Sequence, residues 1–173
     1  MKIKDRKIVY DGFFKVENVT LEHENQTIHR EVIVPKNAVA ALVFDTKKQE
    51  YLLTQQYRVV ANKELIEIVA GLLDKEGEKT EETIAREIEE EIGYAVDKLE
   101  FISCFYSTPG SYAEKIWLYY AEVSQRISEG GGLASEHENL KTVAFSREKL
   151  FSAKFEDAKT LMAVLWEQCR RRS

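Results

Sequence analysis

The N-terminal part of the chain alternates between apolar and polar residues, which is typical of half-buried strands. Three segments show this alternation: Lys7–Tyr10, Phe13–His23 and Thr27–Val34. The turn residues Asp11-Gly12 and Glu24-Asn25 separate them. The pattern predicts a small antiparallel sheet over residues 1–36, which forms an N-terminal β extension.

The rest of the chain, residues 37–173, mixes strand and helix patterns. Val39–Phe44 is an almost unbroken apolar run, as expected of a strand that is buried on both faces. Further strands are predicted at Tyr51–Tyr57, Leu65–Val69, Leu99–Tyr106, Lys115–Val123 and Leu140–Phe145. The segment 37–173 is therefore predicted to be one domain with a mixed sheet.

Helices are predicted in three places. Glu81–Ile92 is predicted to be a helix with Thr80 as its N-cap, because threonine caps helices and the next two glutamates suit the first turn. Ser146 begins a short helix, and Asp157–Cys169 reads as a longer one. This longer helix carries an apolar stripe of Leu161, Val164, Leu165 and Gln168. With helices packed on the faces of the sheet, the fold class is α/β.

Composition and charge exclude several classes of protein. The 173 residues carry a net charge of −5, and the terminal Arg170–Arg172 run is too short to form a nucleic-acid-binding patch. No run of eighteen apolar residues predicts a membrane span, so neither nucleic acid nor membrane is an expected partner. Cys104 and Cys169 offer no disulfide framework, and Cys104 is predicted to be a small core residue. The expected location is the cytoplasm.

The helix at Glu81–Ile92 carries an unusual cluster of acidic residues. Four carboxylates lie within five positions: Glu87, Glu89, Glu90 and Glu91. At roughly 100° per residue, Glu87 and Glu91 project almost together, with Glu90 beside them. The apolar residues Ile84, Ala85, Ile88 and Ile92 fall on a different stripe. Two interpretations remain open: a solvated acidic face, or a rigid platform for an oxygen-seeking cation such as Mg²⁺.

These residues resemble the signature of the Nudix hydrolases, the Nudix box. The matching positions are Gly71, Glu78, Arg86, Glu87, Ile88, Glu90, Glu91, Gly93 and Tyr94. Six residues separate Gly71 from Glu78, where the family pattern has five. The extra residue falls in a turn that contains Gly77, and such an insertion costs little.

The resemblance implies an α/β/α sandwich and a divalent metal, Mg²⁺ with Mn²⁺ as a substitute. It implies that the metal ligands are the side chains of Glu87, Glu90 and Glu91 and the main-chain carbonyl of Ala70. In the family pattern Arg86 orients the glutamates and so belongs to the catalytic set with Glu90. Glu78 would be a weaker ligand.

Two further features resemble the nucleotide-sugar branch of the family. Pro109 lies sixteen positions after Gly93, as in ADP-ribose pyrophosphatases, although Pro-Gly also marks an ordinary turn. The loop after Gly130–Gly132 resembles the catalytic loop of those enzymes. By this resemblance Glu136 is the candidate general base and Glu138 its neighbour, with the order of the two left open. A flexible solvated loop is the alternative interpretation.

Arg58 and Glu67 resemble family positions that contact the diphosphate and the terminal sugar or base. The guanidinium fork of Arg58 suits a diphosphate, and Glu67 can pair with it or accept a hydrogen bond from the nucleoside. The implied substrate is a nucleoside diphosphate sugar, with ADP-ribose first and GDP-mannose second. A nucleoside triphosphate sanitiser and a non-catalytic ADP-ribose sensor are the alternatives. The resemblance also implies a homodimer formed through the N-terminal strands.

Overall fold

The computed structural model describes residues 1–75, 77–132 and 140–172. Its strands are β1 Lys2–Asp11, β2 Lys15–His23, β3 Gln26–Val34, β4 Ala38–Asp45, β5 Glu50–Arg58, β6 Lys63–Glu67, β7 Val69–Leu72, β8 Tyr94–Thr108, β9 Tyr112–Arg126 and β10 Lys141–Phe145. Its helices are α1 Thr80–Ile92, α2 Arg147–Ser152 and α3 Ala158–Arg170. No helix in this part of the chain is long and apolar enough to cross a membrane.

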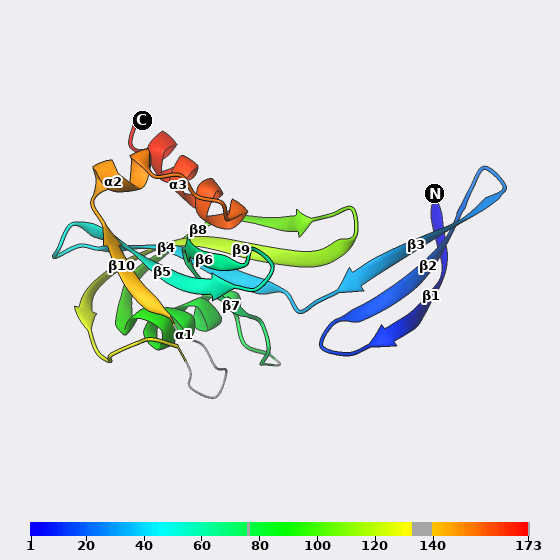
Figure 1. The fold of residues 1–173 in the computed structure, drawn as a ribbon, viewed down its shortest axis with the longest axis horizontal. Coiled ribbons are helices and arrows are strands. Elements are labelled where there is room, and N and C mark those ends of the chain that lie inside the picture. The colour runs from blue at the N-terminus through cyan, green and yellow to red at the C-terminus, as the bar shows by residue number, and fades with distance from the viewer. Residues whose placement is uncertain (76, 133–139, 173) are drawn as a thin grey trace.

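The strands form one mixed sheet in the order β1-β2-β3-β9-β4-β5-β10. Strand β4 runs parallel to β9 and antiparallel to β5, and the long β8–β9 hairpin extends one side of the sheet. Helix α1 covers one face of the sheet, while α2 and α3 cover the other (Figure 1). The predicted mixed sheet between helical layers is confirmed.

A hydrophobic core lies on each face of the sheet, and strand β4 contributes to both because its side chains alternate between the two faces. Val39, Ala41 and Val43 pack with α1, whereas Ala40, Leu42 and Phe44 pack on the face covered by α3. All six are buried. This is the physical reason for the unbroken apolar run in the sequence.

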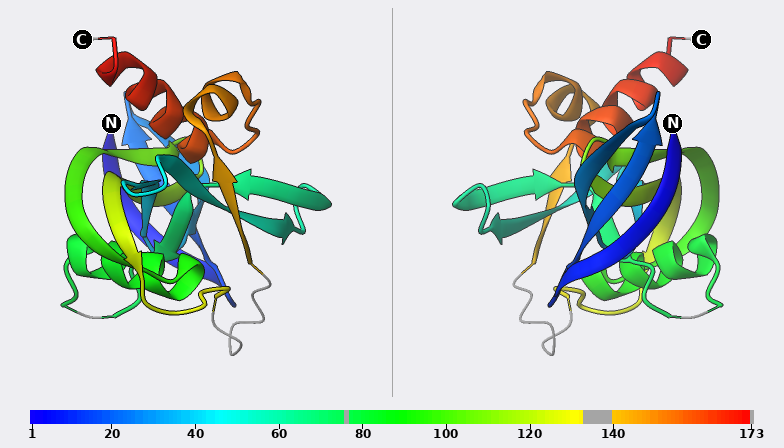
Figure 2. Two further views of the ribbon diagram at one scale, coloured as in Figure 1. Left: turned by 90° about the vertical axis from the view of Figure 1, so that its left-hand side faces the viewer. Right: turned by 90° about the vertical axis from the view of Figure 1, so that its right-hand side faces the viewer.

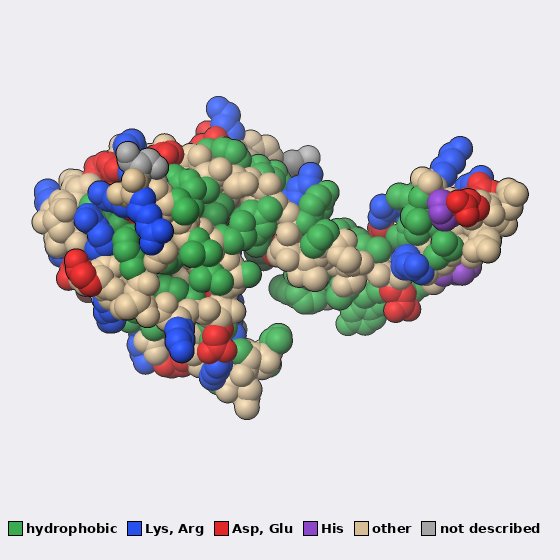
Figure 3. Space-filling model, turned by 90° about the horizontal axis from the view of Figure 1, so that it is seen from above, with side chains coloured by type: hydrophobic (Ala, Val, Ile, Leu, Met, Phe, Trp, Pro, Cys, Tyr) green, Lys and Arg blue, Asp and Glu red, His purple; other side chains and the backbone are tan. Residues whose placement is uncertain are grey.

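The N-terminal strands β1, β2 and β3 form an antiparallel unit that projects away from the helices (Figure 1). Seen along the long axis of the molecule, this unit overlaps the body in projection (Figure 2). A narrow connection joins it to the body when the molecule is seen from the side of α3 (Figure 3). The link to the main sheet is a parallel pairing of Ile33 with Tyr112 and a hydrogen bond of 2.8 Å from the Ile33 N–H to the Ser111 carbonyl. The predicted boundary between residues 36 and 37 remains a prediction.

The strand expected at Leu65–Val69 is wrong, because the chain forms two strands there. Strand β6 pairs with β5, and β7 pairs with β4. Ile68 lies between them, where the chain changes partner strands. Gly71 therefore lies within β7 and not in a loop.

The N-cap predicted for α1 is also wrong. Lys79, with an extended backbone, is the N-cap, and its N–H donates to the Glu82 carboxylate at 3.3 Å. Thr80 lies inside the helix, where its hydroxyl is 2.6 Å from the Tyr119 Oη. This contact with β9 holds Thr80 in the first turn.

Two residues of the apolar stripe of α3, Leu161 and Leu165, are exposed. The buried face consists of Thr160, Ala163, Val164 and Glu167. Glu167 can be buried because its carboxylate accepts hydrogen bonds from the Tyr51 hydroxyl at 2.6 Å and from the Arg171 Nε at 2.7 Å. A pattern based on hydrophobicity assigns such a paired carboxylate to solvent.

Cys104 is exposed, so its prediction as a core residue is wrong. A register shift in the β8–β9 pairing between Phe101 and Ser103 changes which residues of β8 face the core. Ile102 and Phe105 pack against the core instead.

Candidate active site

Helix α1 is fixed to the sheet by its apolar stripe. Ile84, Ile88 and Ile92 are fully buried against the face that β4 and β9 present. Glu91 is also buried, whereas Glu89 is exposed, as expected for the box position that the family leaves unspecified. The helix therefore presents its acidic residues from a rigid support.

Arg86 gathers the carboxylates around a single guanidinium group. Its Nη1 lies 2.8 Å from Glu87 Oε1 and 2.9 Å from Glu90 Oε2, and its Nε lies 3.3 Å from Glu78 Oε1. Asp74 is farther away, 3.7 Å from Nη2. Because Arg86 donates to Glu78, the pKa of that carboxyl is lowered. Burial lowers the pKa of Arg86, but its acidic partners raise it by more, so the guanidinium stays charged.

Gly71 leaves the space that the Glu87 side chain occupies. A Cβ atom at Gly71 would lie 2.0 Å from the Glu87 Cδ and 2.3 Å from one of its oxygens. Ala70 precedes Gly71 in β7 and pairs with Ala40 of β4. The fold thus brings the main chain at Gly71 against the carboxylate of Glu87. The assignment of the Ala70 carbonyl and Glu87 as metal ligands remains a prediction.

The C-terminal end of α1 is held by the glycine run. Gly93 ends the helix in the left-handed conformation (φ 81°). The N–H groups of Gly131 and Gly132 then donate to the carbonyls of Glu91 and Glu90 at 2.8 and 3.0 Å. Gly130, Gly131 and Gly132 all have positive φ. These glycines therefore bind the end of the helix that carries the acidic cluster.

Arg58 and Glu67 form a two-pronged ion pair. The Arg58 Nε lies 2.5 Å from Glu67 Oε1, and the Nη2 lies 2.8 Å from Oε2. Lys159 of α3 also reaches Glu67 Oε2, at 2.5 Å. Burial raises the pKa of Glu67, but Arg58 and Lys159 lower it by more, to about 2. Of the two roles predicted for Glu67, the structure shows the pairing with Arg58.

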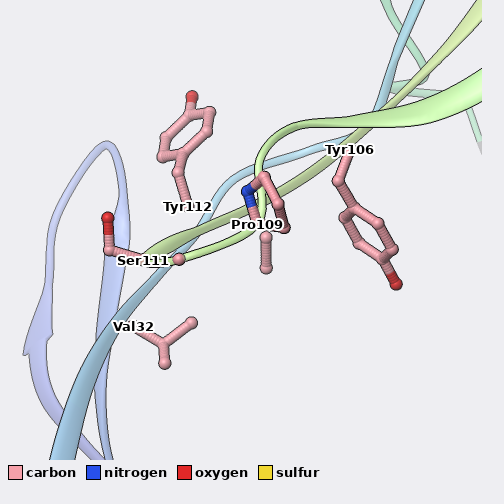
Figure 4. A pocket seen from close by; sticks show the side chains of 7 residues that line it. Val32, Tyr106, Pro109, Ser111 and Tyr112 are labelled. Carbon is pink, nitrogen blue, oxygen red and sulfur yellow. The ribbon is translucent and has the colours of Figure 1, made fainter.

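Pro109 lies away from α1, at the tip of the β8–β9 hairpin (Figure 1). It lines a cavity of about 230 Å³ between the hairpin tip and β3. Tyr106, Ser111, Tyr112 and Val32 lie around it (Figure 4). Within one chain, the structure does not bring Pro109 together with the acidic helix.

The predicted loop residues Glu136 and Glu138 lie outside the described residues. Their assignment as general base and neighbour remains a prediction. The described chain resumes at Leu140, which is buried, just before β10.

The acidic cluster has the chemistry of a divalent-cation site. Among the described residues, no three His, Cys, Asp or Glu side chains are already arranged around a metal position. Glu87 and Glu90 instead both contact Nη1 of Arg86. Two carboxylates that share one cationic group, beside the main chain of Ala70–Gly71, supply the oxygen donors that Mg²⁺ prefers. These residues fit a divalent cation once Glu87 and Glu90 turn toward it.

Residues 34–164 match the family model of the NUDIX domain. The chain belongs to the Nudix family. The predictions of family, fold and enzyme class are confirmed: the protein is a Nudix hydrolase.

Curated relatives of this Nudix hydrolase match along almost the entire chain. The ADP-ribose pyrophosphatase of Haemophilus influenzae is 28% identical over 97% of this chain and 86% of its own length. The GDP-mannose pyrophosphatase of Cronobacter sakazakii is 33% identical over 97% of this chain and 94% of its own length. A solved structure titled as an ADP compounds hydrolase matches with a TM-score of 0.80 and 24% identity, covering 99% of this chain and 96% of the other.

Two residues of this Nudix site carry no signal in the sequence. Asp74 lies in the turn that contains the extra residue, and only the structure places it near Arg86. Lys159 is more than 90 positions from Glu67 in the chain, yet contacts it. Long-range contacts of this kind depend on how α3 packs on the sheet.

Proposed function

We propose that the protein hydrolyses the diphosphate linkage of a nucleoside diphosphate sugar, with ADP-ribose giving AMP and ribose 5-phosphate. GDP-mannose is the second candidate, because relatives with either name match this chain over almost its full length. The observation that carries the proposal is the convergence of Glu78, Glu87 and Glu90 on Arg86 beside Gly71.

Ala70, through its carbonyl, and Glu87, Glu90 and Glu91 would hold Mg²⁺, or Mn²⁺ in its place. When bound, the cation would neutralise the diphosphate and make a water molecule more acidic. The residues themselves have separate tasks. Arg86 keeps the glutamates together, since their mutual repulsion would otherwise spread them apart.

Arg58 would bind the diphosphate. Its two bonds to Glu67 use the Nε–Nη2 edge of the guanidinium, and 41% of the side chain is exposed. The other edge is thus directed away from Glu67 and suits two phosphate oxygens. A loop glutamate, Glu136 with Glu138 as the alternative, would take the proton from the attacking water as the P–O bond to the leaving phosphate breaks.

We further propose a homodimer through the N-terminal strands. Phe13, Phe14 and Tyr10 are exposed on this unit, which is unusual for large apolar side chains in a monomer. A second chain would cover them and would give Pro109 a way to contribute to substrate binding, since Pro109 lies beside the same unit. The cytoplasmic location stays a prediction.

A substrate panel tests the reaction directly. The protein is incubated with Mg²⁺ and ADP-ribose, GDP-mannose or 8-oxo-dGTP, and phosphate is measured after a phosphatase has acted on the products. The expected result is release from ADP-ribose or GDP-mannose. Turnover of 8-oxo-dGTP alone would support a sanitiser, and binding of ADP-ribose without turnover would support a sensor.

Two neighbouring glutamates of α1 provide a matched pair of variants for the metal site. Glu90→Gln should lower Mg²⁺-dependent turnover at least about 100-fold, as for the loss of a charge-stabilising group in an active site. Glu89→Gln, at an exposed position of the same helix, should leave it unchanged. Equal rates for the two variants would contradict the assignment of Glu90. Glu136→Gln and Glu138→Gln, compared in the same assay, identify the base.

A further inference from the structure

The junction between β6 and β7 is held by the first turn of α3. Ile68 sits where the chain leaves β5 for β4, and its N–H donates to the Thr160 hydroxyl at 2.9 Å. The Thr160 hydroxyl in turn donates to the N-cap residue Asp157 at 2.5 Å. An N–H that has left the strand ladder inside the protein needs such an acceptor.

Lys159, the neighbour of Thr160, forms an ion pair with Glu67, the residue that precedes Ile68 in the same junction. Its ammonium group lies 2.5 Å from Glu67 Oε2 and 2.9 Å from Asp157 Oδ1, and its side chain is only 13% exposed. Glu67 is 3% exposed at its side chain. Two consecutive residues of α3 therefore hold two consecutive residues of the β6–β7 junction, one through its side chain and one through its main chain.

The Arg58–Glu67 pair faces the side of the sheet that α1 covers. Leu52 of β5 packs in the core on that side, and Arg58 has the same parity along the strand. Glu67 pairs across with Thr54, which shares this parity. The hydrogen bonds that Arg58 donates to Glu67 contribute most to the raised pKa of Arg58, and the charge of Glu91 also raises this pKa. Lys159 therefore extends from α3, on one face of the sheet, to the Arg58–Glu67 pair, which faces the side covered by α1.

We infer that Lys159 is a positioning residue: it locks the carboxylate of Glu67 and thereby sets the direction in which Arg58 presents its guanidinium to the diphosphate. This inference rests on the proposed function. The carboxylate of Glu67 contacts two cationic side chains, and its Oε2 accepts hydrogen bonds from both Arg58 and Lys159. Without the ammonium group, the carboxylate is free to turn with Arg58, and the arginine loses its fixed direction.

The chain contains a matched ion pair for comparison. Lys63 of β6 pairs with Glu156, which directly precedes the N-cap of α3, with Nζ–Oε1 at 2.7 Å. Both side chains are about half exposed or more. This pair joins the same two regions of the fold, and Lys63 lies opposite Arg58 in the β5–β6 pairing, but it makes no ion pair with Glu67. It therefore controls for the loss of a nearby cation, and exposed pairs of this kind contribute little to stability.

The test compares Lys159→Met, Lys159→Arg and Lys63→Met with the parent, using the nucleotide sugar that the parent hydrolyses fastest. Lys159→Met keeps most of the alkyl chain and removes the charge. It should raise KM about 10-fold to 100-fold, as expected when a charge-assisted contact is lost, and change kcat about twofold or less. Lys159→Arg should restore most of the loss, and Lys63→Met should match the parent. An unchanged KM in Lys159→Met overturns the inference.

A second comparison separates positioning from direct binding. If Lys159 acts through Glu67, Lys159→Met should have no further effect on KM in a Glu67→Gln background. A full additional effect there would mean that Lys159 touches the substrate itself, and would overturn the inference. If the parent hydrolyses no nucleotide sugar, the proposed function is wrong. If the parent hydrolyses one and the KM effects of Lys159→Met and Glu67→Gln are fully additive, only the proposed role of Lys159 is wrong.

Discussion

The backbones of Gly93 and Gly130 are in close contact at the C-terminal end of α1, and the contact leaves no space for a side chain at either residue. A Cβ at Gly93 would lie 2.3 Å from the Ser128 carbonyl oxygen and 3.1 Å from the Gly130 nitrogen. A Cβ at Gly130 would lie 2.7 Å from the Ile92 carbonyl carbon and 2.8 Å from the Gly93 nitrogen. The close approach lets Gly131 and Gly132 donate to the helix end that carries Glu90 and Glu91.

Gly130→Ala should therefore destabilise the protein by more than the roughly 1–2 kcal/mol that positive φ costs an alanine, because backbone atoms must also move. Gly77→Ala is the control, since Gly77 has a similar φ of 80° and nothing within 4 Å of the added methyl. Urea unfolding of both variants measures the difference. Equal losses of stability would mean that the contact between the two backbones is not tight in solution.

Gly71→Ala should impair the metal site while leaving the fold stable. The new methyl would overlap the Glu87 carboxylate, which is the flexible end of a side chain and can move away. The expected result is a higher Mg²⁺ concentration for half-maximal activity and lower turnover, with a change in unfolding free energy of less than about 1 kcal/mol. A Mg²⁺ titration of activity, paired with thermal unfolding, checks both parts. Normal Mg²⁺ dependence would show that Glu87 does not need this position.

The buried Glu67 predicts a loss of stability in acid. Its pKa is about 2 in the folded protein and about 4.3 in an unfolded chain. A lowered pKa stabilises the fold fully above the unfolded value, and this contribution, on the order of 3 kcal/mol, disappears as the pH falls from about 4.5 toward 2. Urea unfolding at several pH values, for the parent and Glu67→Gln, measures it. The difference in unfolding free energy between the parent and Glu67→Gln should become smaller as the pH falls from about 4.5 toward 2. A difference that does not change with pH would contradict the ion-paired state of Glu67.

The C-terminal arginines should differ in their effects on stability. Arg171→Met removes a donor from the buried carboxylate of Glu167 and leaves it with the Tyr51 hydroxyl and a longer contact of 3.8 Å to the Arg170 Nε. Because Arg171 is 35% exposed at its side chain, the expected loss is about 1–2 kcal/mol and not the larger cost of a fully buried pair. Arg172→Met, at an exposed position, should stay within about 0.5 kcal/mol of the parent. Thermal or urea unfolding distinguishes them, and equal stabilities would mean that Glu167 finds another partner.

Local patterns were sufficient for most of the elements and for the acidic helix. The β4 strand, α1 and its terminal Gly93 follow from apolar runs, helical spacing and a helix-ending glycine, all of which act within a few residues. The clustering of Glu87, Glu90 and Glu91 beside an apolar stripe also follows from spacing alone. The box positions then identify the family, because their spacing is specific.

The predictions failed where a distant partner changes what a residue can do. Thr80 is held inside α1 by Tyr119, and Glu167 is buried in α3 because Tyr51 and Arg171 satisfy its charge. The split of Leu65–Val69 into two strands depends on which neighbouring strand each half can reach. Tyr119 and Tyr51 lie far along the chain from Thr80 and Glu167, whereas Arg171 follows Glu167 by one helical turn and β6 forms a hairpin with β5.

The sequence by itself determined the family, the layered α/β fold and the side chains suited to a divalent cation, because these depend on residue type and local spacing. Only the tertiary structure decided how those side chains are held: Glu87 in the space beside Gly71, the end of α1 against Gly130, and Glu67 between Arg58 and Lys159. Such contacts join different elements of the fold, and those of Gly130 and Lys159 join elements far apart in the chain. Their geometry is set by packing of helices on a sheet, which no local pattern encodes.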